Sequence, residues 1–80
     1  MKTLDGDLNQ LFEQKDLLKC NGIETVQMGV YPCVADEDVP KALWIIWENR
    51  CPGWWHYQED YIEHGICTSV EFRERLMKEV

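Results

Sequence analysis

Hydrophobic residues recur at helical spacing near the start of the chain. Polar side chains separate them at intervals of three and four residues, which gives one apolar face made of Leu4, Leu8, Leu11, Phe12 and Leu18. Asn21 and Gly22 follow, and this pair favours the left-handed turn that ends many helices. Lys15 and Lys19 lie in the last turns, where cations complement the helix dipole. The pattern predicts an amphipathic helix over residues 5–20.

The pattern changes to strict alternation after Gly22. Val26, Met28 and Val30 alternate with other residues over positions 24–31, as in a half-buried strand. We expect Pro32 to end the regular pairing of this strand, because proline has no backbone N–H. A lone strand leaves its backbone groups without partners, so this strand must pair within the chain or across a dimer interface.

Residues 42–47 form the longest apolar run, and they allow two interpretations. Their β-branched and aromatic side chains suit a buried strand that pairs with 24–31. The flanking residues favour a helix, because the acidic run 36–38 offers negative charge and a cap, Pro40 suits a first turn, and Pro52 follows as a terminator. We expect the helix, with an arc made of Val39, Ala42, Leu43, Ile46 and Trp47 and with Trp44 and Ile45 on its flanks.

Two further helices are expected in the last third of the chain. On a helical wheel, one side holds Trp54, Trp55, Tyr57, Tyr61 and Ile62, and the other holds His56, Glu59, Asp60 and Glu63. Gly65 is placed to end this helix, and the capping-box pattern of residues 68–71 begins the next. The final helix has an apolar face of Val70, Phe72, Leu76, Met77 and Val80. Arg73 lies within this face and must reach the surface or meet a carboxylate.

Length and charge narrow the class of protein. Eighty residues with 15 acidic and 8 basic side chains carry a formal charge of −7, and 45% of the residues are hydrophobic. These values are typical of one small globular domain, here residues 1–80, without room for a deep substrate cavity. We therefore expect a helix-rich α+β domain, with an N-terminal helix, a central strand around 24–31 and two or three C-terminal helices.

The same composition also limits the expected cellular location of the protein and its binding to nucleic acid or membrane. Nucleic-acid binding is disfavoured, because Lys and Arg supply most of that affinity. The longest apolar run is far shorter than the roughly 20 residues of a membrane span. The start of the chain lacks the apolar segment of a signal peptide, so we expect a cytoplasmic protein.

Four cysteines are a further source of candidate chemistry. An even number in a short chain permits a disulfide framework, but a reducing compartment favours free, mostly buried thiols. One set has the composition of a tetrahedral zinc site: Cys51, His56, His64 and Cys67. Its spacing matches none of the common zinc patterns, and on one helix His56 and His64 lie about 12 Å apart. We expect no metal and no cofactor, and keep a zinc-stabilised or cysteine-based redox domain as the alternative.

The same thiols are the candidates for a catalytic nucleophile. Cys51 and Cys67 are close in sequence to His56 and His64, and the final helix begins just after Cys67, where its N-terminus favours a lowered thiol pKa. No third residue is identifiable to orient the histidine, and no glycine-rich oxyanion turn is present. We therefore do not expect an enzyme.

Two acidic clusters remain as the candidate binding site. They are Asp36, Glu37 and Asp38, and Glu59, Asp60 and Glu63, and neither contains a basic residue. Repulsion within a cluster costs a few tenths of a kcal/mol, so the clusters either maintain solubility or attract a basic partner. Trp44 and Trp55 lie at the edges of their apolar faces and are the expected aromatic contacts of an interface.

These features together predict a non-enzymatic protein-binding module. We expect an inhibitor or adaptor that docks on the basic surface of a partner protein, such as a nucleic-acid-binding one. Small proteins of phages and mobile elements share this size and charge. No direct contact with nucleic acid or membrane is expected, and a homodimer formed through strand 24–31 stays open.

Overall fold

The computed structural model describes residues 1–79, which form three strands, four α-helices and two short 3-10 helices. The strands are β1 (Lys2–Thr3), β2 (Val26–Met28) and β3 (Tyr31–Val34). The α-helices are α1 (Leu8–Cys20), α2 (Val39–Glu48), α3 (Gln58–Glu63) and α4 (Ser69–Glu79), and the 3-10 helices are η1 (Asp36–Asp38) and η2 (Trp54–Tyr57). The expected helix-rich α+β architecture is confirmed.

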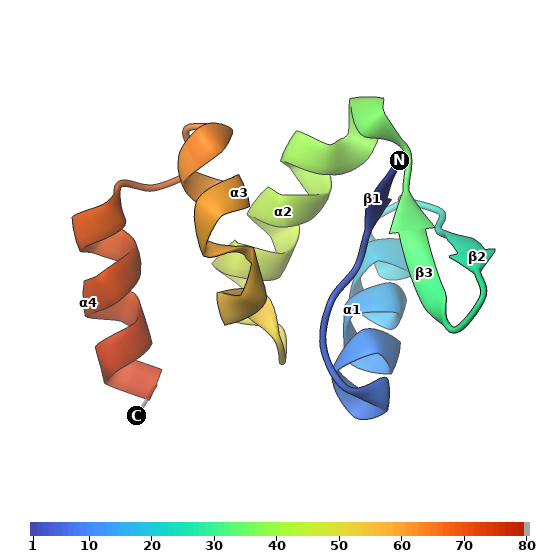
Figure 1. Ribbon diagram of the computed structural model, residues 1–80, viewed down its shortest axis with the longest axis horizontal. Coiled ribbons are helices and arrows are strands. Elements are labelled where there is room, and N and C mark those ends of the chain that lie inside the picture. The colour runs from blue at the N-terminus through green and yellow to red at the C-terminus, as the bar shows by residue number, and fades with distance from the viewer. Residues whose placement is uncertain (80) are drawn as a thin grey trace.

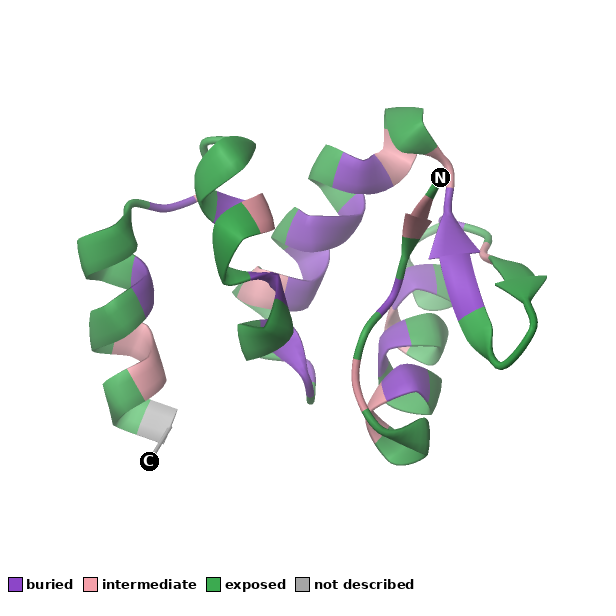
Figure 2. Cartoon of the chain, in the orientation of Figure 1, coloured by how far each residue is buried: buried purple, intermediate pink, exposed green. Residues whose placement is uncertain are grey.

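The three strands form an antiparallel sheet in the order β1-β3-β2, with α1 against it and the other α-helices leading away from it. In Figure 1, α1 lies behind the strands, and α2, α3 and α4 follow one another away from them. Figure 2 shows that β3 and much of α2 are buried, whereas β2 is exposed along its whole length. The core therefore lies around α2, between the sheet with α1 on one side and α3 with α4 on the other.

The N-terminal helix begins at Leu8, later than the expected residue 5, because Asp7 caps it. The Asp7 carboxylate accepts a hydrogen bond from the Gln10 N–H, and the Gln10 side chain accepts one from the Asp7 N–H, each 2.9 Å long. Gly22, with φ +80°, ends the helix. The Ile23 N–H then donates to the Leu18 carbonyl, which confirms the expected stop.

The apolar face predicted for α1 is only partly right. The buried residues are Leu11, Gln14 and Leu18, whereas Leu8 and Phe12 are almost two-thirds exposed. Leu8 and Phe12 lie on the side of α1 that faces the β2–β3 hairpin. The two strands are too short to cover them, so hydrophobic side chains stay in contact with solvent there.

Residues 24–34 form a hairpin rather than one strand. Gly29, with φ +65°, makes the turn with Val30, and β3 then pairs back along β2. The expectation of a half-buried strand is wrong for Val26, Met28 and Val30, all of which are exposed. The alternation is real, but Val26 and Met28 lie on the face of the sheet opposite α1, which no helix within residues 1–79 covers.

Pro32 does not end the pairing, because it lies inside β3 opposite Gln27. Its carbonyl accepts a 2.9 Å hydrogen bond from the Leu4 N–H, so the backbone polar groups of Pro32 are directed toward the N-terminal segment. An N–H at position 32 would also point toward the N-terminal segment, at a place just past the end of β1. The ladder between β2 and β3 therefore loses no hydrogen bond.

The apolar run 42–47 is helical, as expected, and lies in α2 after the turn η1. Pro40 occupies the first turn, but none of the acidic side chains of η1 caps the helix. Ile45 is buried rather than on a flank, while Trp44 stays 47% exposed. Arg50 ends the helix with φ +47°, in the left-handed region that glycine usually occupies.

The helix expected over residues 54–63 is divided into η2 and α3. Trp54 and Tyr57 are both buried, and the tight turn of a 3-10 helix places residues three apart on the same side. Trp55 and Ile62, expected on the buried side, are each 37% exposed. The helix stop at Gly65 is confirmed, since the Ile66 N–H donates to the Tyr61 carbonyl.

The last helix, α4, begins where it was expected, but the side that packs against the core differs from the predicted apolar face. Thr68 and Glu71 form the predicted capping box, with two reciprocal hydrogen bonds of 3.2 Å. Arg73 is exposed, and Arg75 instead stacks on the Trp47 ring, 4.0 Å from its centroid. The buried side of α4 is Phe72 with partly buried Leu76, whereas Val70 and Met77 are exposed and Val80 lies outside the described residues.

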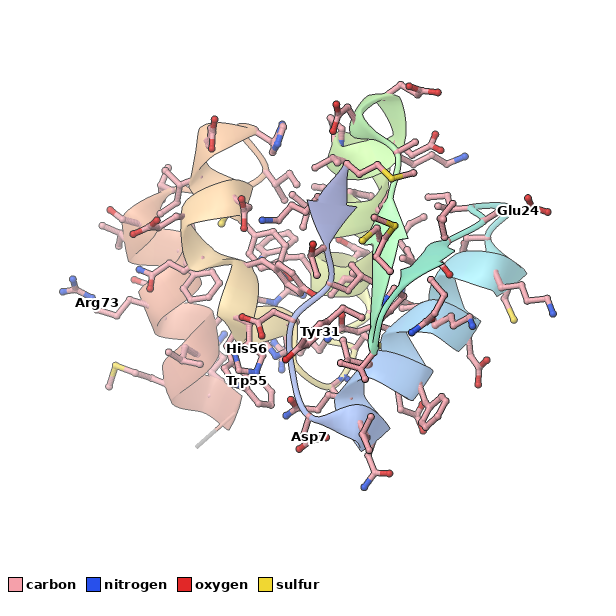
Figure 3. The ribbon with its side chains drawn as sticks, turned by 45° about the vertical axis from the view of Figure 1, so that its right-hand side comes forward. Asp7, Glu24, Tyr31, Trp55, His56 and Arg73 are labelled. Carbon is pink, nitrogen blue, oxygen red and sulfur yellow. The ribbon has the colours of Figure 1, made fainter. Side chains whose placement is uncertain are left out.

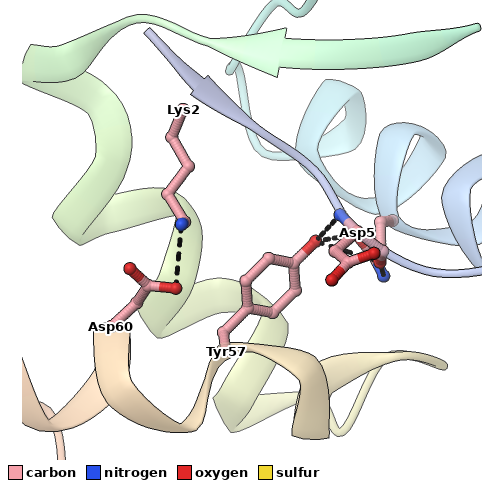
Figure 4. Close-up of polar contacts among 5 residues, drawn as sticks. Lys2, Asp5, Tyr57 and Asp60 are labelled. Atoms are coloured by element: carbon pink, nitrogen blue, oxygen red, sulfur yellow. Dashed lines mark hydrogen bonds and ion pairs between the residues drawn. The ribbon is translucent and has the colours of Figure 1, made fainter.

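One buried polar network connects the two halves of the chain. The Gln14 side-chain amide is fully buried and donates to the carbonyls of Asp5 (2.9 Å) and Pro52 (3.0 Å). The Tyr57 hydroxyl donates to the Gln14 oxygen (2.5 Å) and accepts from the Asp5 N–H (2.7 Å), as drawn in part in Figure 4. Burial raises the pKa of Tyr57, which keeps this donor protonated.

We expect Gln14→Leu to destabilise the protein by about 2 to 4 kcal/mol, because it removes the buried amide that donates to two carbonyls and leaves the buried Tyr57 hydroxyl without the Gln14 acceptor. Chemical denaturation measures the loss. The matched control is Gln58→Leu at an exposed glutamine, where a change within about 0.5 kcal/mol is expected. Equal effects of the two substitutions would contradict the importance of the network.

Gly53 packs against this network with φ +89°, and a Cβ atom there would collide with the Gln14 amide nitrogen. Gly22 has a similar φ of +80° with open space around it. We expect Gly22→Ala to cost about 1 kcal/mol for the left-handed backbone alone. Gly53→Ala should cost about 1 to 3 kcal/mol more, because the core must also shift. Thermal unfolding of both variants measures the difference.

Candidate functional site

The two acidic clusters lie on either side of β1. The Lys2 amine contacts the Asp60 carboxylate at 2.8 Å, and the Met1 amine contacts the Asp36 carboxylate at 2.6 Å. Figure 4 shows the Lys2–Asp60 pair beside the Tyr57–Asp5 contacts. The first two residues of the chain, Met1 just before β1 and Lys2 within it, therefore connect η1 with α3. We call Asp36, Glu37, Asp38, Glu59, Asp60 and Glu63 together the acidic surface.

Neither cluster contains a basic residue, as the sequence shows, but two of the carboxylates have cationic partners at the start of the chain. Asp60 is only partly exposed, with its carboxylate held by Lys2, and Asp36 is paired although its side chain is open to solvent. Glu37, Glu59 and Glu63 are exposed. The acidic surface therefore keeps an excess of negative charge, carried mainly by these three glutamates.

The structure separates the two tryptophans that were expected in the interface. Trp44 lies on α2, less than two helical turns from η1, with its ring centroid 5.7 Å from that of Trp47. Trp55 stacks beside His56, whose ring contacts Gln10 of α1. Figure 3 shows Trp55 and His56 near Asp7, at the end of the molecule opposite η1 in Figure 1. Only Trp44 lies near the η1 part of the acidic surface.

The thiols have the opposite of the properties that a nucleophile needs. Burial, and then the nearby Glu13 carboxylate, raises the pKa of Cys51 to about 11. Burial also raises the pKa of Cys67, with Glu71 adding to the effect and Arg75 opposing it. The expectation that the last helix lowers the Cys67 pKa is therefore wrong. Both thiols stay protonated at neutral pH, and their arrangement offers no activated nucleophile.

The candidate zinc residues do not converge. Cys51 and Cys67 are buried, whereas His56 and His64 are exposed on different turns. Within residues 1–79, no three His, Cys, Asp or Glu side chains are placed to share a metal ion. All four cysteines are free, and Cys20 is the exposed one.

Sequence reasoning missed a second exposed surface, which is apolar. It consists of Leu8 and Phe12 of α1 and of Val26, Met28, Val30 and Tyr31 of the hairpin, and we call it the apolar edge. A groove of about 200 Å³ lies between α1 and the hairpin, with Phe12, Lys15 and Val30 among its lining residues. The available signal was the uncharged stretch 25–31, which the sequence analysis interpreted as a strand with one buried face.

Comparisons of the chain with protein-family models, with curated proteins and with solved structures found no match. Among the described residues, no helix is both long and apolar enough to cross a membrane.

The raised pKa of Cys51 predicts a pH dependence of stability. The folded protein keeps the Cys51 proton up to about pH 11, whereas the unfolded chain releases it near pH 8.5. The stabilisation is complete below about pH 8.5 and is lost as the pH rises toward 11. We expect the free energy of unfolding in urea to fall over this window. Cys51→Ala should make the fall shallower, and an unchanged slope would contradict the assignment.

Proposed function

We propose that the protein is a non-enzymatic protein-binding module that acts as an inhibitor or adaptor. Its acidic surface docks on a basic surface of a partner protein, of the kind that binds nucleic acid. The supporting observation is that the first two residues of the chain each contact one of the two acidic clusters, which come from distant parts of the sequence. The N-terminal segment thereby brings together negative charge that the sequence distributes over two separate segments.

The grouping of carboxylates in the acidic surface favours a role in attracting a basic partner over a role in solubility alone. Carboxylates dispersed over a surface are enough for solubility, whereas a concentrated set produces a field that steers an oppositely charged partner. Glu37, Glu59 and Glu63 are exposed and available for such contacts. Trp44, nearly half exposed beside Trp47, supplies apolar area with little loss of side-chain entropy.

Charge reversal tests this proposal. Proteins captured from a host lysate by the wild-type chain are compared with those captured by Glu59→Lys/Glu63→Lys, which leaves the Lys2–Asp60 pair intact. We expect a basic protein to be lost from the variant. With that protein purified, the association rate should fall on the order of 10- to 100-fold and should lose most of its salt dependence.

The matched control is Glu13→Lys/Asp16→Lys, which changes the net charge equally on an exposed part of α1. We expect this control to retain the partner. Trp44→Ala should weaken binding by about 2 kcal/mol or more, and Trp55→Ala, at the other end of the molecule, should not. Equal retention by both charge variants would show that the acidic residues serve only solubility.

A further inference from the structure

The open edge of the sheet lies at β2, and its hydrogen-bonding groups can be assigned. Pro32 directs its backbone polar groups toward the N-terminal segment, so Gln27, directly opposite on β2, directs its N–H and C=O away from β3. No strand within residues 1–79 pairs with this outer edge. In Figure 1, β2 forms the outer edge of the molecule. The Gln27 backbone groups are therefore available to another strand.

Apolar side chains flank this edge on both faces of the sheet. Val26, Met28 and Tyr31 lie on the uncovered face, and Leu8, Phe12 and Val30 lie on the α1 side. A side chain of this size offers about 150 to 200 Å², so the six expose roughly 600 Å² per chain. A standard interface buries about 800 Å² per partner. The backbone of the β2 edge and the polar groups beside it supply the remaining area.

The edge lacks the charged residues and the proline that keep many exposed strands apart. Proteins usually place lysine, proline or a bulge on an open strand to prevent pairing. Residues 25–31 contain no charged side chain, and β2 itself contains no proline. Pro32 lies on β3, where it leaves the outer edge unaffected.

We propose that a second copy of this chain covers the apolar edge. The two β2 strands pair antiparallel about a two-fold axis through Gln27, and the sheets join into one of six strands. Gln27 exchanges two backbone hydrogen bonds with Gln27 of the second copy. Val26 then lies opposite Met28 of the second copy, so that an apolar row crosses the interface on the uncovered face.

The charges near the edge favour a second copy as the occupant. The same two-fold axis places the two α1 helices antiparallel on one side of the joined sheet. The N-terminal end of one helix, with Asp7, is then directed toward the C-terminal end of the other, with Lys15 and Lys19. Lys15 lines the groove between α1 and the hairpin, and Lys15 and Lys19 line a second groove, with Glu24, between α1 and the segment that leads into β2. This relative direction is electrostatically favourable for the side-chain charges at the helix ends and for the helix dipoles.

Sedimentation of the purified protein over micromolar to millimolar concentrations tests the pairing. We expect a reversible monomer–dimer equilibrium. Met28→Lys should weaken dimerisation at least tenfold, because it places a charge in the apolar row, while Met77→Lys on α4 should not. Both methionines are exposed, at 57% and 72%, so neither change should alter folding. Circular dichroism and unfolding midpoints check this.

Gln27→Pro is a second variant that leaves the backbone hydrogen bonds between β2 and β3 intact, because the lost N–H faces the open edge. Within the chain it removes only the exposed bond from the Gln27 side chain to the Gly29 carbonyl. It should abolish the dimer. In a mixed isotope-labelled sample, NMR should show contacts between the methyl groups of Val26 and of Met28 of the second copy. A chain that stays monomeric at millimolar concentration would overturn the proposal. So would a dimer that Met28→Lys leaves intact or that lacks these contacts, since another face would then hold the copies together.

This inference is independent of the proposed function. Glu59 and Glu63 lie on α3, whereas the apolar edge belongs to the β2–β3 hairpin and α1. The dimer is measured with the purified chain alone, and the basic partner is measured with charge reversals that do not touch the hairpin. Failure of one test therefore leaves the other unaffected.

Discussion

The buried side-chain amide of Gln14 is the interaction on which the rest of the fold depends. Gln14 lies on α1. Its amide donates to the Asp5 carbonyl, which precedes α1, and to the Pro52 carbonyl in the loop after α2. The Tyr57 hydroxyl completes the set from η2. Burying an amide without partners is costly, so this set forms completely or the core does not close. The network thereby sets the position of α1 relative to both halves of the chain.

Local signals in the sequence predicted the parts of the fold that depend on nearby residues. The capping box that begins at Thr68 and the stops at Gly22 and Gly65 form as expected. The helical state of residues 42–47 also follows from neighbours such as Pro40. Each of these features is determined within about five positions along the chain, which is the range over which capping and backbone preferences act.

Features determined by distant contacts were not predictable in this way. Leu8 and Phe12 share the expected face of α1, but the polar Gln14 is buried in their place because its partners lie far away in the sequence. Arg75 rather than Arg73 contacts the core because Trp47 is placed to receive it. For the candidate site, the sequence identified the acidic residues. It gave no indication that Lys2 joins them or that the hairpin exposes an apolar surface.

The contacts of the N-terminal segment also constrain the order in which the chain can fold. Lys2 and Asp5 bind Asp60 and Tyr57, more than fifty residues later, and β1 pairs with β3 only by crossing the whole of α1. During synthesis the first strand therefore has no complete binding site until η2 and α3 have emerged. Despite its high helix content, the chain depends on closing this long loop, which slows folding compared with a simple helical bundle. Its first residues are among the last to reach their final place.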